Sequence, residues 1–240
     1  MTVLVTGAAG FVGSHVAHAL LARGERVVGI DNLNTYYDPS LKSARLARLT
    51  ALNGFSFVQG DVSDRAAVTG VAAQFGDIDR IVHLAAQAGV RHSMVDPYAY
   101  VQSNVMGHLT MLELARNIRS LRHFVYASTS SVYGGNTDMP FRETDRVDTP
   151  LSLYAASKRA DELISHAYAH LFGFPQTGLR FFTVYGPWGR PDMAYYSFAK
   201  AIAAGEPIVL YDDGRLKRDF TYIDDIVAGV VGALDRPPTD

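Results

Sequence analysis

The chain has 240 residues, of which 48% are hydrophobic, and this is enough for one domain with a buried core and part of a second. Its 22 basic and 24 acidic residues nearly cancel, so no nucleic-acid partner and no anionic membrane surface is expected. The lack of cysteine excludes disulfides and thiolate chemistry. The sequence also shows no basic leader and no apolar run of roughly 18 residues, and together these features predict a soluble, cytoplasmic protein.

Short runs typical of β-strands alternate along the chain with longer stretches of helical pattern. The runs are TVLVT, RVVGI, FSFVQ, RIVHL, HFVYA and TGLRFF, which begin at residues 2, 26, 55, 80, 123 and 177. Continuous apolar strands that are separated by helices form a parallel sheet covered on both faces. The predicted fold class is therefore α/β, a doubly wound parallel sheet of the Rossmann type.

Helical patterns fill most of the intervals between these strands. The clearest are at residues 11–23, from 63–64 onward, at 97–117 and at 152–172. After residue 182 the alternation weakens, and TVYGPWGRPDM, residues 183–193, predicts an ordered loop. We place a domain boundary near Arg180, with residues 1–180 as the first domain and 181–240 in a second, smaller one.

Gly7, Gly10 and Gly13 lie between the first strand and the first helix, which Phe11 and Val12 open. Glycines let the backbone turn tightly and approach a pyrophosphate, whose charge is then held by the amides at the helix N-terminus. Three glycines at a strand–helix turn can also serve packing alone. The turn is therefore a candidate cofactor site that needs a second signal.

The second signal is an acidic residue after the second strand. Asp31, followed by Asn32, lies at about the distance expected of the carboxylate that binds the adenosine ribose of a dinucleotide. Such a carboxylate repels a 2′-phosphate, and no arginine adjoins it in the sequence. The combination predicts NAD rather than NADP as the cofactor.

Two further strand ends are candidates for cofactor contact. Asp61 and Val62, after the third strand, are placed to meet the adenine, although Asp61 could equally be the N-cap of a helix. Leu84, Ala85 and Ala86 end the fourth strand in a stretch of small residues, which either lets the cofactor lie close or forms a packing turn.

The stretch ASTSSVYGG, residues 127–135, places Thr129, Ser130 and Ser131 at the carboxyl end of the fifth strand, where open α/β sheets bind ligands. Tyr154 and Lys158 follow in YAASK, four residues apart and hence on one helix face. An adjacent ammonium favours a tyrosine phenolate, which can take a proton from a substrate hydroxyl while NAD takes the hydride. One of the hydroxyls would relay that proton or hold the substrate oxygen.

The motifs GAAGFVG, GDV, HLAAQAGVR, STSSVYG, YAASK, LRFFTVYGP and RDFTYIDD together resemble the extended short-chain dehydrogenase/reductase family, in particular its nucleotide-sugar epimerases and dehydratases. The resemblance implies that Thr129, Tyr154 and Lys158 are catalytic, with Tyr154 as the base and Lys158 also binding the nicotinamide ribose. It implies a cofactor-side role for Asn104, which could equally satisfy a backbone kink. It also implies a substrate-diphosphate contact for Arg218, which could otherwise be a solvated surface charge.

Within this family the sequence is most similar to the UDP-glucuronate 4-epimerases. The dehydratases carry Asp-Glu after the catalytic threonine, and the UDP-glucuronate decarboxylases typically carry Thr-Ser-Glu. Here Ser130 and Ser131 fill the two positions after Thr129. Elimination would therefore lack its acid/base, whereas epimerisation needs only the removal and return of a hydride.

The segment TVYGPWGRPDMA resembles the uronate-epimerase loop and implies that Thr183 and Arg190 hold the sugar carboxylate. A guanidinium can bind a carboxylate through two parallel hydrogen bonds. Arg190 could otherwise lie in solvent. Arg91 and Tyr211 are further candidates for substrate contact.

Relatives of this kind usually continue beyond YIDDIVAGVVGAL, so the resemblance implies that residues 181–240 form only part of a substrate-binding domain. It further implies a UDP-sugar substrate and a homodimer that pairs through the long helices after Asp96 and Ser152. No metal is expected. Two alternatives stay open: a UDP-glucuronate decarboxylase or nucleotide-sugar dehydratase, and a catalytically silent NAD-binding regulator.

Overall fold

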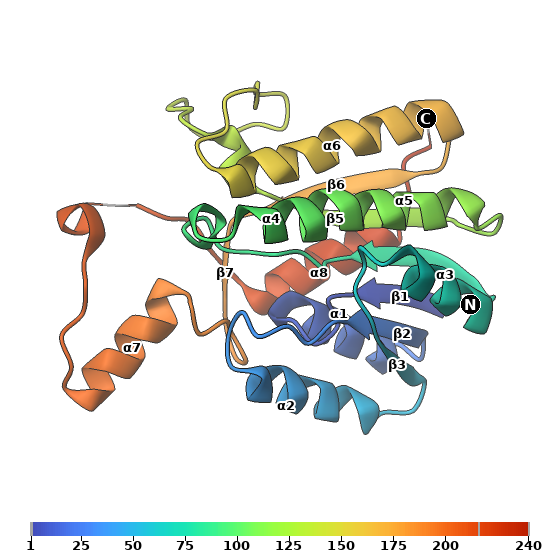
Figure 1. Ribbon diagram of the computed structural model, residues 1–240, viewed down its shortest axis with the longest axis horizontal. Helices are drawn as coiled ribbons and strands as arrows, with labels where there is room; N and C mark the ends of the chain where they lie inside the picture. Colours follow the sequence, from blue (N-terminus) through green and yellow to red (C-terminus); the bar gives the residue numbers. More distant parts are fainter. Residues whose placement is uncertain (1, 216, 240) are drawn as a thin grey trace.

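A computed structural model describes residues 2–215 and 217–239, apart from the side chains of residues 211 and 212. Its centre is a six-stranded parallel sheet with the strand order β3-β2-β1-β4-β5-β6 (Figure 1). The strands are β1 (Thr2–Thr6), β2 (Arg26–Asp31), β3 (Phe55–Gln59), β4 (Ile78–His83), β5 (His123–Thr129) and β6 (Gln176–Phe181). This order confirms the predicted doubly wound fold, and it brings the carboxyl ends of all six strands to one edge of the sheet.

Helices connect the strands and cover both faces of the sheet. They are α1 (Phe11–Ala22), α2 (Pro39–Thr50), α3 (Arg65–Gln74), α4 (Pro97–Tyr100), α5 (Gly107–Asn117), α6 (Leu153–Phe172), α7 (Ala194–Ala204) and α8 (Ile223–Leu234). Short 3₁₀ segments are η1 (His92–Met94), η3 (Ser130–Tyr133) and η4 (Tyr211–Gly214), and η2 (Val101–Met106) is a π-helix. Within the described residues, no helix combines the length and the apolar character needed to cross a membrane.

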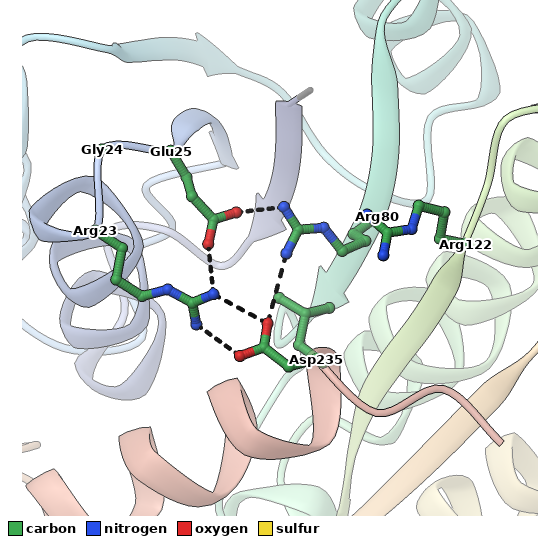
Figure 2. A pocket seen from close by; sticks show the side chains of 7 residues that line it. Arg23, Gly24, Glu25, Arg80, Arg122 and Asp235 are labelled. Carbon is green, nitrogen blue, oxygen red and sulfur yellow. Dashed lines mark hydrogen bonds and ion pairs between the residues drawn. The ribbon is translucent and has the colours of Figure 1, made fainter.

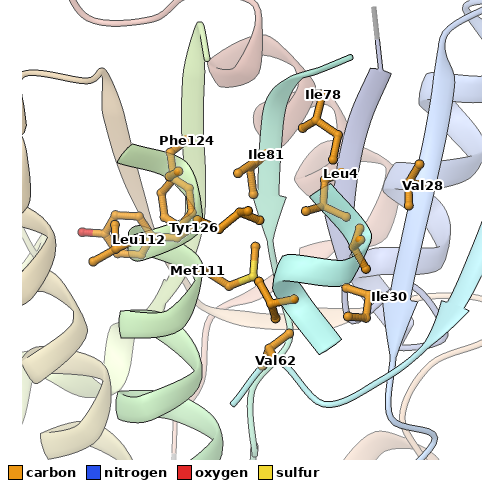
Figure 3. Close-up of a cluster of buried hydrophobic side chains, with 14 of the residues drawn as sticks. Leu4, Val28, Ile30, Val62, Ile78, Ile81, Met111, Leu112, Phe124 and Tyr126 are labelled. Carbon is orange, nitrogen blue, oxygen red and sulfur yellow. The ribbon is translucent and has the colours of Figure 1, made fainter. Parts of the chain in front are cut away.

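The alternation of side chains along the buried strands divides the core into two layers. Leu4 of β1 faces one layer, where it joins residues of α3 and α5 such as Val68 and Met111 (Figure 3). Val3 and Val5 face the other layer, which α1, α2 and α8 cover. The inner strands β1, β2, β4 and β5 are thus mostly buried on both sides, and this explains why they were recognisable as continuous hydrophobic runs.

One predicted helix is confirmed with a local difference, and one predicted loop needs revision. Residues 97–117 are helical throughout, but the middle of the helix is the wider π-helix η2, between α4 and α5. The predicted loop at 183–193 begins with strand β7 (Thr183–Tyr185), which pairs in parallel with β8 (Phe220–Tyr222) in a separate two-stranded sheet.

The boundary near Arg180 stays a prediction, and the structure adds one feature to it. Helix α8 lies within residues 181–240, yet its Val230 and Leu234 are buried in the layer formed with α1. Helix α7, in contrast, has no buried residue and extends away from the sheet (Figure 1).

An open cavity lies at the amino ends of the strands, on the opposite edge from the predicted site (Figure 2). Ion pairs account for its polar walls. Arg23 donates to Asp235 at 2.9 Å and lies 3.1 Å from Glu25, and Arg80 pairs with Glu25. These pairs fasten the end of α8 to the end of α1 and to β4, so the cavity reflects how the helices are anchored.

Candidate functional site

The glycine turn after β1 is shaped so closely that none of its three glycines has room for a side chain; a Cβ on Gly10 would lie 2.9 Å from the Gly7 oxygen. Gly7 has a φ of +71°, and a Cβ on it would lie 2.9 Å from the Ala85 nitrogen. A Cβ on Gly13 would lie 2.0 Å from the Gly7 oxygen. Gly10 is the N-cap of α1 and supplies no side-chain cap. The first amides of α1 are therefore left for a ligand, and a pyrophosphate fits this cradle.

Asp31 connects this turn to the segment after β2. It is only 8% exposed, and its carboxylate accepts hydrogen bonds from the Ala9 nitrogen at 3.0 Å and the Leu33 nitrogen at 2.9 Å. These bonds use part of the capacity of a carboxylate, which has about four acceptor positions. Asp31 therefore keeps the capacity to accept bonds from ribose hydroxyls beside the pyrophosphate cradle, and that contact stays a prediction.

The structure adds a cation that the sequence did not place near Asp31. Lys42 of α2 is 6% exposed, interacts electrostatically with Asp31 and donates to the Asn34 carbonyl at 2.8 Å. Burial lowers the pKa of Lys42, and the Asp31 charge opposes this effect. The repulsion of a 2′-phosphate by Asp31 is thus partly balanced by a nearby ammonium.

This balance predicts the effect of Asp31→Asn, which keeps the shape of the side chain but removes its charge. We expect NAD to bind roughly ten- to a hundredfold more weakly, because charge-assisted hydrogen bonds contribute about 1.5–3 kcal/mol. The affinity for NADP should fall less than that for NAD, because the Asp31 charge then no longer opposes the attraction of Lys42 for the 2′-phosphate. Calorimetric titration with both cofactors measures the ratio, with Asp148→Asn on the surface as the control. Tighter binding of NADP than of NAD by the unmodified protein would contradict the assignment.

Asp61 lies next to Asn32 and does not cap a helix. Its carboxylate accepts from Asn32 Nδ2 at 2.7 Å and from the Ser63 nitrogen at 2.8 Å, whereas Asp64 is the N-cap of α3. Burial alone would raise the pKa of Asp61, but these hydrogen bonds outweigh it and hold the pKa below its usual value. Val62 is buried in the core. The contacts of Asp61 and Val62 with adenine stay predictions.

The segment after β4 is held from two sides. The Leu84 and Ala85 nitrogens donate to Thr6 Oγ1 at 3.1 and 3.0 Å. Asn104, which lies in the π-helix and is 1% exposed, accepts from the Gln87 nitrogen at 2.7 Å and donates to the Gln87 carbonyl.

Asn104 also donates to Ser157 Oγ at 2.9 Å. Its amide therefore ties the cofactor-side loop to α6, and this is a different task from satisfying the backbone of its own helix. Contacts of Asn104 and of residues 84–86 with the cofactor stay predictions.

Thr129 lies on an element in contact with the helix that carries Tyr154 and Lys158, because α6 packs along β5 and η3. Thr129 is 7% exposed at the end of β5, donates to Ser131 Oγ at 3.2 Å and accepts from the Ser131 nitrogen. Tyr154 lies in the first turn of α6, half-buried, with its ring edge-on to Tyr100. The hydroxyl of Thr129 thus has a structural duty as the cap of η3 besides its predicted catalytic one.

Lys158 is 3% exposed, and its Nζ donates to Asp161 Oδ2 at 2.6 Å. Sequence reasoning missed Asp161, because a carboxylate three residues after a helical lysine is usually a surface ion pair. Here the pair lies at the interface of α6 with the rest of the domain, where both side chains are buried.

Arg190 lies near Tyr154, with which it interacts electrostatically. Its guanidinium binds Asp192 through two bonds, from Nε at 3.0 Å and from Nη2 at 2.5 Å. Tyr36 also donates to Asp192, and burial followed by the Asp192 charge raises the pKa of Tyr36 to about 12. Asp192 therefore occupies the fork that the sequence assigned to a substrate carboxylate, and a substrate must displace it or share the arginine.

The loop that carries Arg190 is anchored by a buried arginine that the sequence did not reveal. Arg45 of α2 is 1% exposed and donates to the Trp188 carbonyl at 2.6 Å, the Gly189 carbonyl at 3.1 Å and the Ala9 carbonyl at 3.3 Å. It thereby joins the glycine turn to the residues just before Arg190. Helical periodicity alone could not identify Arg45, because its partners are the Tyr37 hydroxyl and backbone atoms of two distant loops.

The remaining substrate candidates lie around this loop. Thr183 begins β7, and its nitrogen donates to the Asp219 carbonyl at 3.2 Å. Arg218 precedes β8 and is exposed, as is Arg91 before η1. The side chain of Tyr211 lies outside the described residues. Ser130 and Ser131 are half-buried in η3. The substrate contacts of all these residues stay predictions.

Comparisons with known proteins agree with this geometry. Residues 3–240 match the model of the NAD dependent epimerase/dehydratase family. The chain is 52% identical to a probable UDP-glucuronate 4-epimerase of Rhizobium meliloti over 240 residues, all of this chain and 70% of that protein. It is 52% identical to UDP-glucuronate 4-epimerase 4 of Arabidopsis thaliana, covering 98% of this chain but only about half, 54%, of that protein.

A solved structure is also similar, that of UDP-glucuronic acid 4-epimerase from Bacillus cereus in complex with UDP-glucuronic acid and NAD. It matches 98% of this chain and 74% of its own, with 40% identity and a TM-score of 0.91.

Proposed function

Because this chain belongs to the NAD-dependent epimerase/dehydratase family, we propose that it inverts carbon 4 of a UDP-sugar and that this sugar is UDP-glucuronate, converted to UDP-galacturonate. The observation that carries the choice of substrate is the placement of Arg190 beside Tyr154. This arrangement sets a carboxylate-binding fork next to the base. The relatives named UDP-glucuronate 4-epimerase support the same choice.

The side chains of the site divide the reaction between them. Tyr154 removes the proton of the 4-hydroxyl, and Thr129 holds that oxygen as it becomes a carbonyl. Lys158 favours the phenolate form of Tyr154. NAD held in the glycine cradle would supply hydride transfer from carbon 4 and back to its opposite face. Tyr154 gives the proton back to the 4-oxygen, and the product is the epimer.

The residues after Thr129 argue against the alternative reactions. Dehydration needs an acid and a base beside the sugar, but Ser130 and Ser131 occupy the two positions that follow Thr129. The nearby carboxylate of Glu162 is engaged by Ser128 at 2.5 Å and by Arg180 at 2.9 Å. A decarboxylase remains the alternative enzyme, and a silent NAD-binding protein the alternative without turnover.

A substrate comparison tests the proposal. The protein is incubated with UDP-glucuronate, UDP-glucose and UDP-N-acetylglucosamine, and the UDP-sugars formed are resolved by chromatography and mass. We expect epimerisation of UDP-glucuronate to be preferred over that of the neutral sugars, because they offer Arg190 no carboxylate. A UDP-pentose as the main product would favour the decarboxylase, and no product from any sugar would favour the silent binder.

We further propose a homodimer that pairs through α6 and the helix running through α4 and η2. Exposed apolar side chains gather on these elements: Tyr98 is 84%, Leu163 55% and Leu171 67% exposed. Leu163 and Leu171 lie two helical turns apart and hence on one face of α6. Sedimentation velocity should show a dimer that Leu163→Glu converts to monomer. A monomer in the unmodified protein would contradict the proposal.

A further inference from the structure

The buried ion pair between Lys158 and Asp161 goes beyond the expected catalytic residues. The two side chains are 3% and 0% exposed and are joined by a 2.6 Å hydrogen bond one turn apart on α6. An ammonium has three donors, so this bond leaves Lys158 two for other partners. Asp161 can therefore hold Lys158 without preventing it from binding a ribose.

The groups around this pair are mostly uncharged at neutral pH. Burial lowers the pKa of His83 to about 3 and that of His108 well below its usual value, and it raises the pKa of Tyr126 to about 12. His83 and His108 both interact electrostatically with Lys158. His108 and Tyr126 belong to α5 and β5, which pack against α6.

The neighbouring carboxylate of Glu162 is held by Arg180 and Arg159. Asp161 is thus the carboxylate that balances the charge of Lys158. Burial raises the pKa of Asp161 to about 6, against the pull of Lys158, so the carboxylate is ionised at neutral pH.

We propose that Asp161 is a positioning residue that fixes the Lys158 ammonium and sets the pH range in which Tyr154 acts as the base. The proposal rests on the proposed function for the role of Tyr154. Two effects of the Asp161 charge act together. It balances the charge of the buried Lys158 ammonium, and it partly cancels the field with which Lys158 favours the Tyr154 phenolate.

Asp161→Asn removes the charge and keeps the shape, so both effects disappear. The phenolate of Tyr154 then forms at lower pH, and Lys158 loses its proton at lower pH. We expect both limbs of the profile of kcat/KM against pH to move down by about one pH unit, the lower end of the range for an adjacent charge. Asp148→Asn removes a charge from an exposed carboxylate near Arg159 and should leave the profile unchanged.

A second readout does not depend on epimerisation. The near-ultraviolet absorbance of the phenolate is titrated in the protein and in its Tyr154→Phe counterpart, and the difference isolates Tyr154. In the Asp161→Asn variant, the absorbance assigned to Tyr154 should appear at lower pH than in the parent protein. If it does so while no UDP-sugar is epimerised, the proposed function fails and the role of Asp161 stands.

Unchanged titration and unchanged profile in a folded Asp161→Asn variant would overturn the proposal, even if kcat fell. Should that variant not fold, Asp161→Glu provides the test. Asp161→Glu keeps the charge, so Tyr154 should titrate at the same pH in this variant as in the parent protein, whatever the change in kcat. A downward shift of the size expected for the loss of a charge would then contradict the proposal.

Discussion

Replacing Tyr154 with phenylalanine is expected to abolish epimerisation while leaving the cofactor bound. The variant loses the proton acceptor and almost no volume, and general base catalysis is worth about 10²–10⁴-fold in rate. The ring of Tyr154 packs edge-on to Tyr100, a contact that phenylalanine can keep. Rates are measured with UDP-glucuronate, and NAD binding by calorimetry.

The control for this variant is Tyr196→Phe, which removes a hydroxyl from a side chain of α7 that is 44% exposed. It should retain the parent rate. A Tyr154→Phe protein that turns over near the parent rate would remove Tyr154 from the mechanism. A variant that is inactive because it no longer binds NAD would show that the hydroxyl serves binding instead of proton transfer.

Replacing Arg190 with alanine is expected to slow the reaction and to change its products. Oxidation of carbon 4 of a glucuronate places a ketone β to the carboxylate, and such an acid loses carbon dioxide when its carboxylate turns perpendicular to the carbonyl plane. A guanidinium that binds the carboxylate through two bonds prevents this rotation. Without it we expect kcat/KM to fall roughly ten- to a hundredfold, and part of the flux to end as a decarboxylated 4-keto-pentose.

Asp192 sharpens this expectation, because it fills the fork of Arg190 in the structure. Arg190→Lys keeps the charge but loses the planar pair of donors. Compared with Arg190→Ala, it should therefore recover more of the substrate binding than of the original product ratio. Arg26→Ala, which removes an exposed arginine at the amino end of β2, is the matched control. If the Arg190 variants give only slower epimerisation and no product lighter by carbon dioxide, Arg190 is not the residue that restrains the carboxylate.

The central sheet could be predicted from the sequence because its inner strands, β1, β2, β4 and β5, are mostly buried on both faces. This burial makes them continuous apolar runs, and all six observed strands begin within two residues of the predicted ones. The helix ends at Gly24 and Ser152 were predictable for a local reason. Gly24 has a φ of +80°, and the Ser152 side chain caps α6.

Other features depend on partners that are distant in the chain. The wide turn of η2 surrounds Asn104, whose amide reaches Gln87 and Ser157, and no periodicity within residues 97–117 records those contacts. Strand β7 needs β8, which lies more than thirty residues later in the chain. A pattern read in one window cannot contain such a pairing.

The candidate site divides in the same way. Motifs placed the glycine turn, Asp31, Tyr154 and Lys158, because each has a fixed position at a strand or helix end. The motifs did not reveal the partners of two cations of the site, which are Asp161 for Lys158 and Asp192 for Arg190. A carboxylate two or three residues from a cation is common on surfaces. Burial distinguishes the Lys158–Asp161 pair, whereas the Arg190–Asp192 pair is partly exposed and is distinguished by its closeness to Tyr154.

The central claim is that one hydride leaves carbon 4 and returns to it within a single site. It is tested most directly with UDP-glucuronate that carries deuterium on carbon 4, followed by nuclear magnetic resonance of the product. The account predicts UDP-galacturonate that retains the deuterium on carbon 4. Product that has exchanged this deuterium for solvent hydrogen, or no UDP-galacturonate at all, would contradict it.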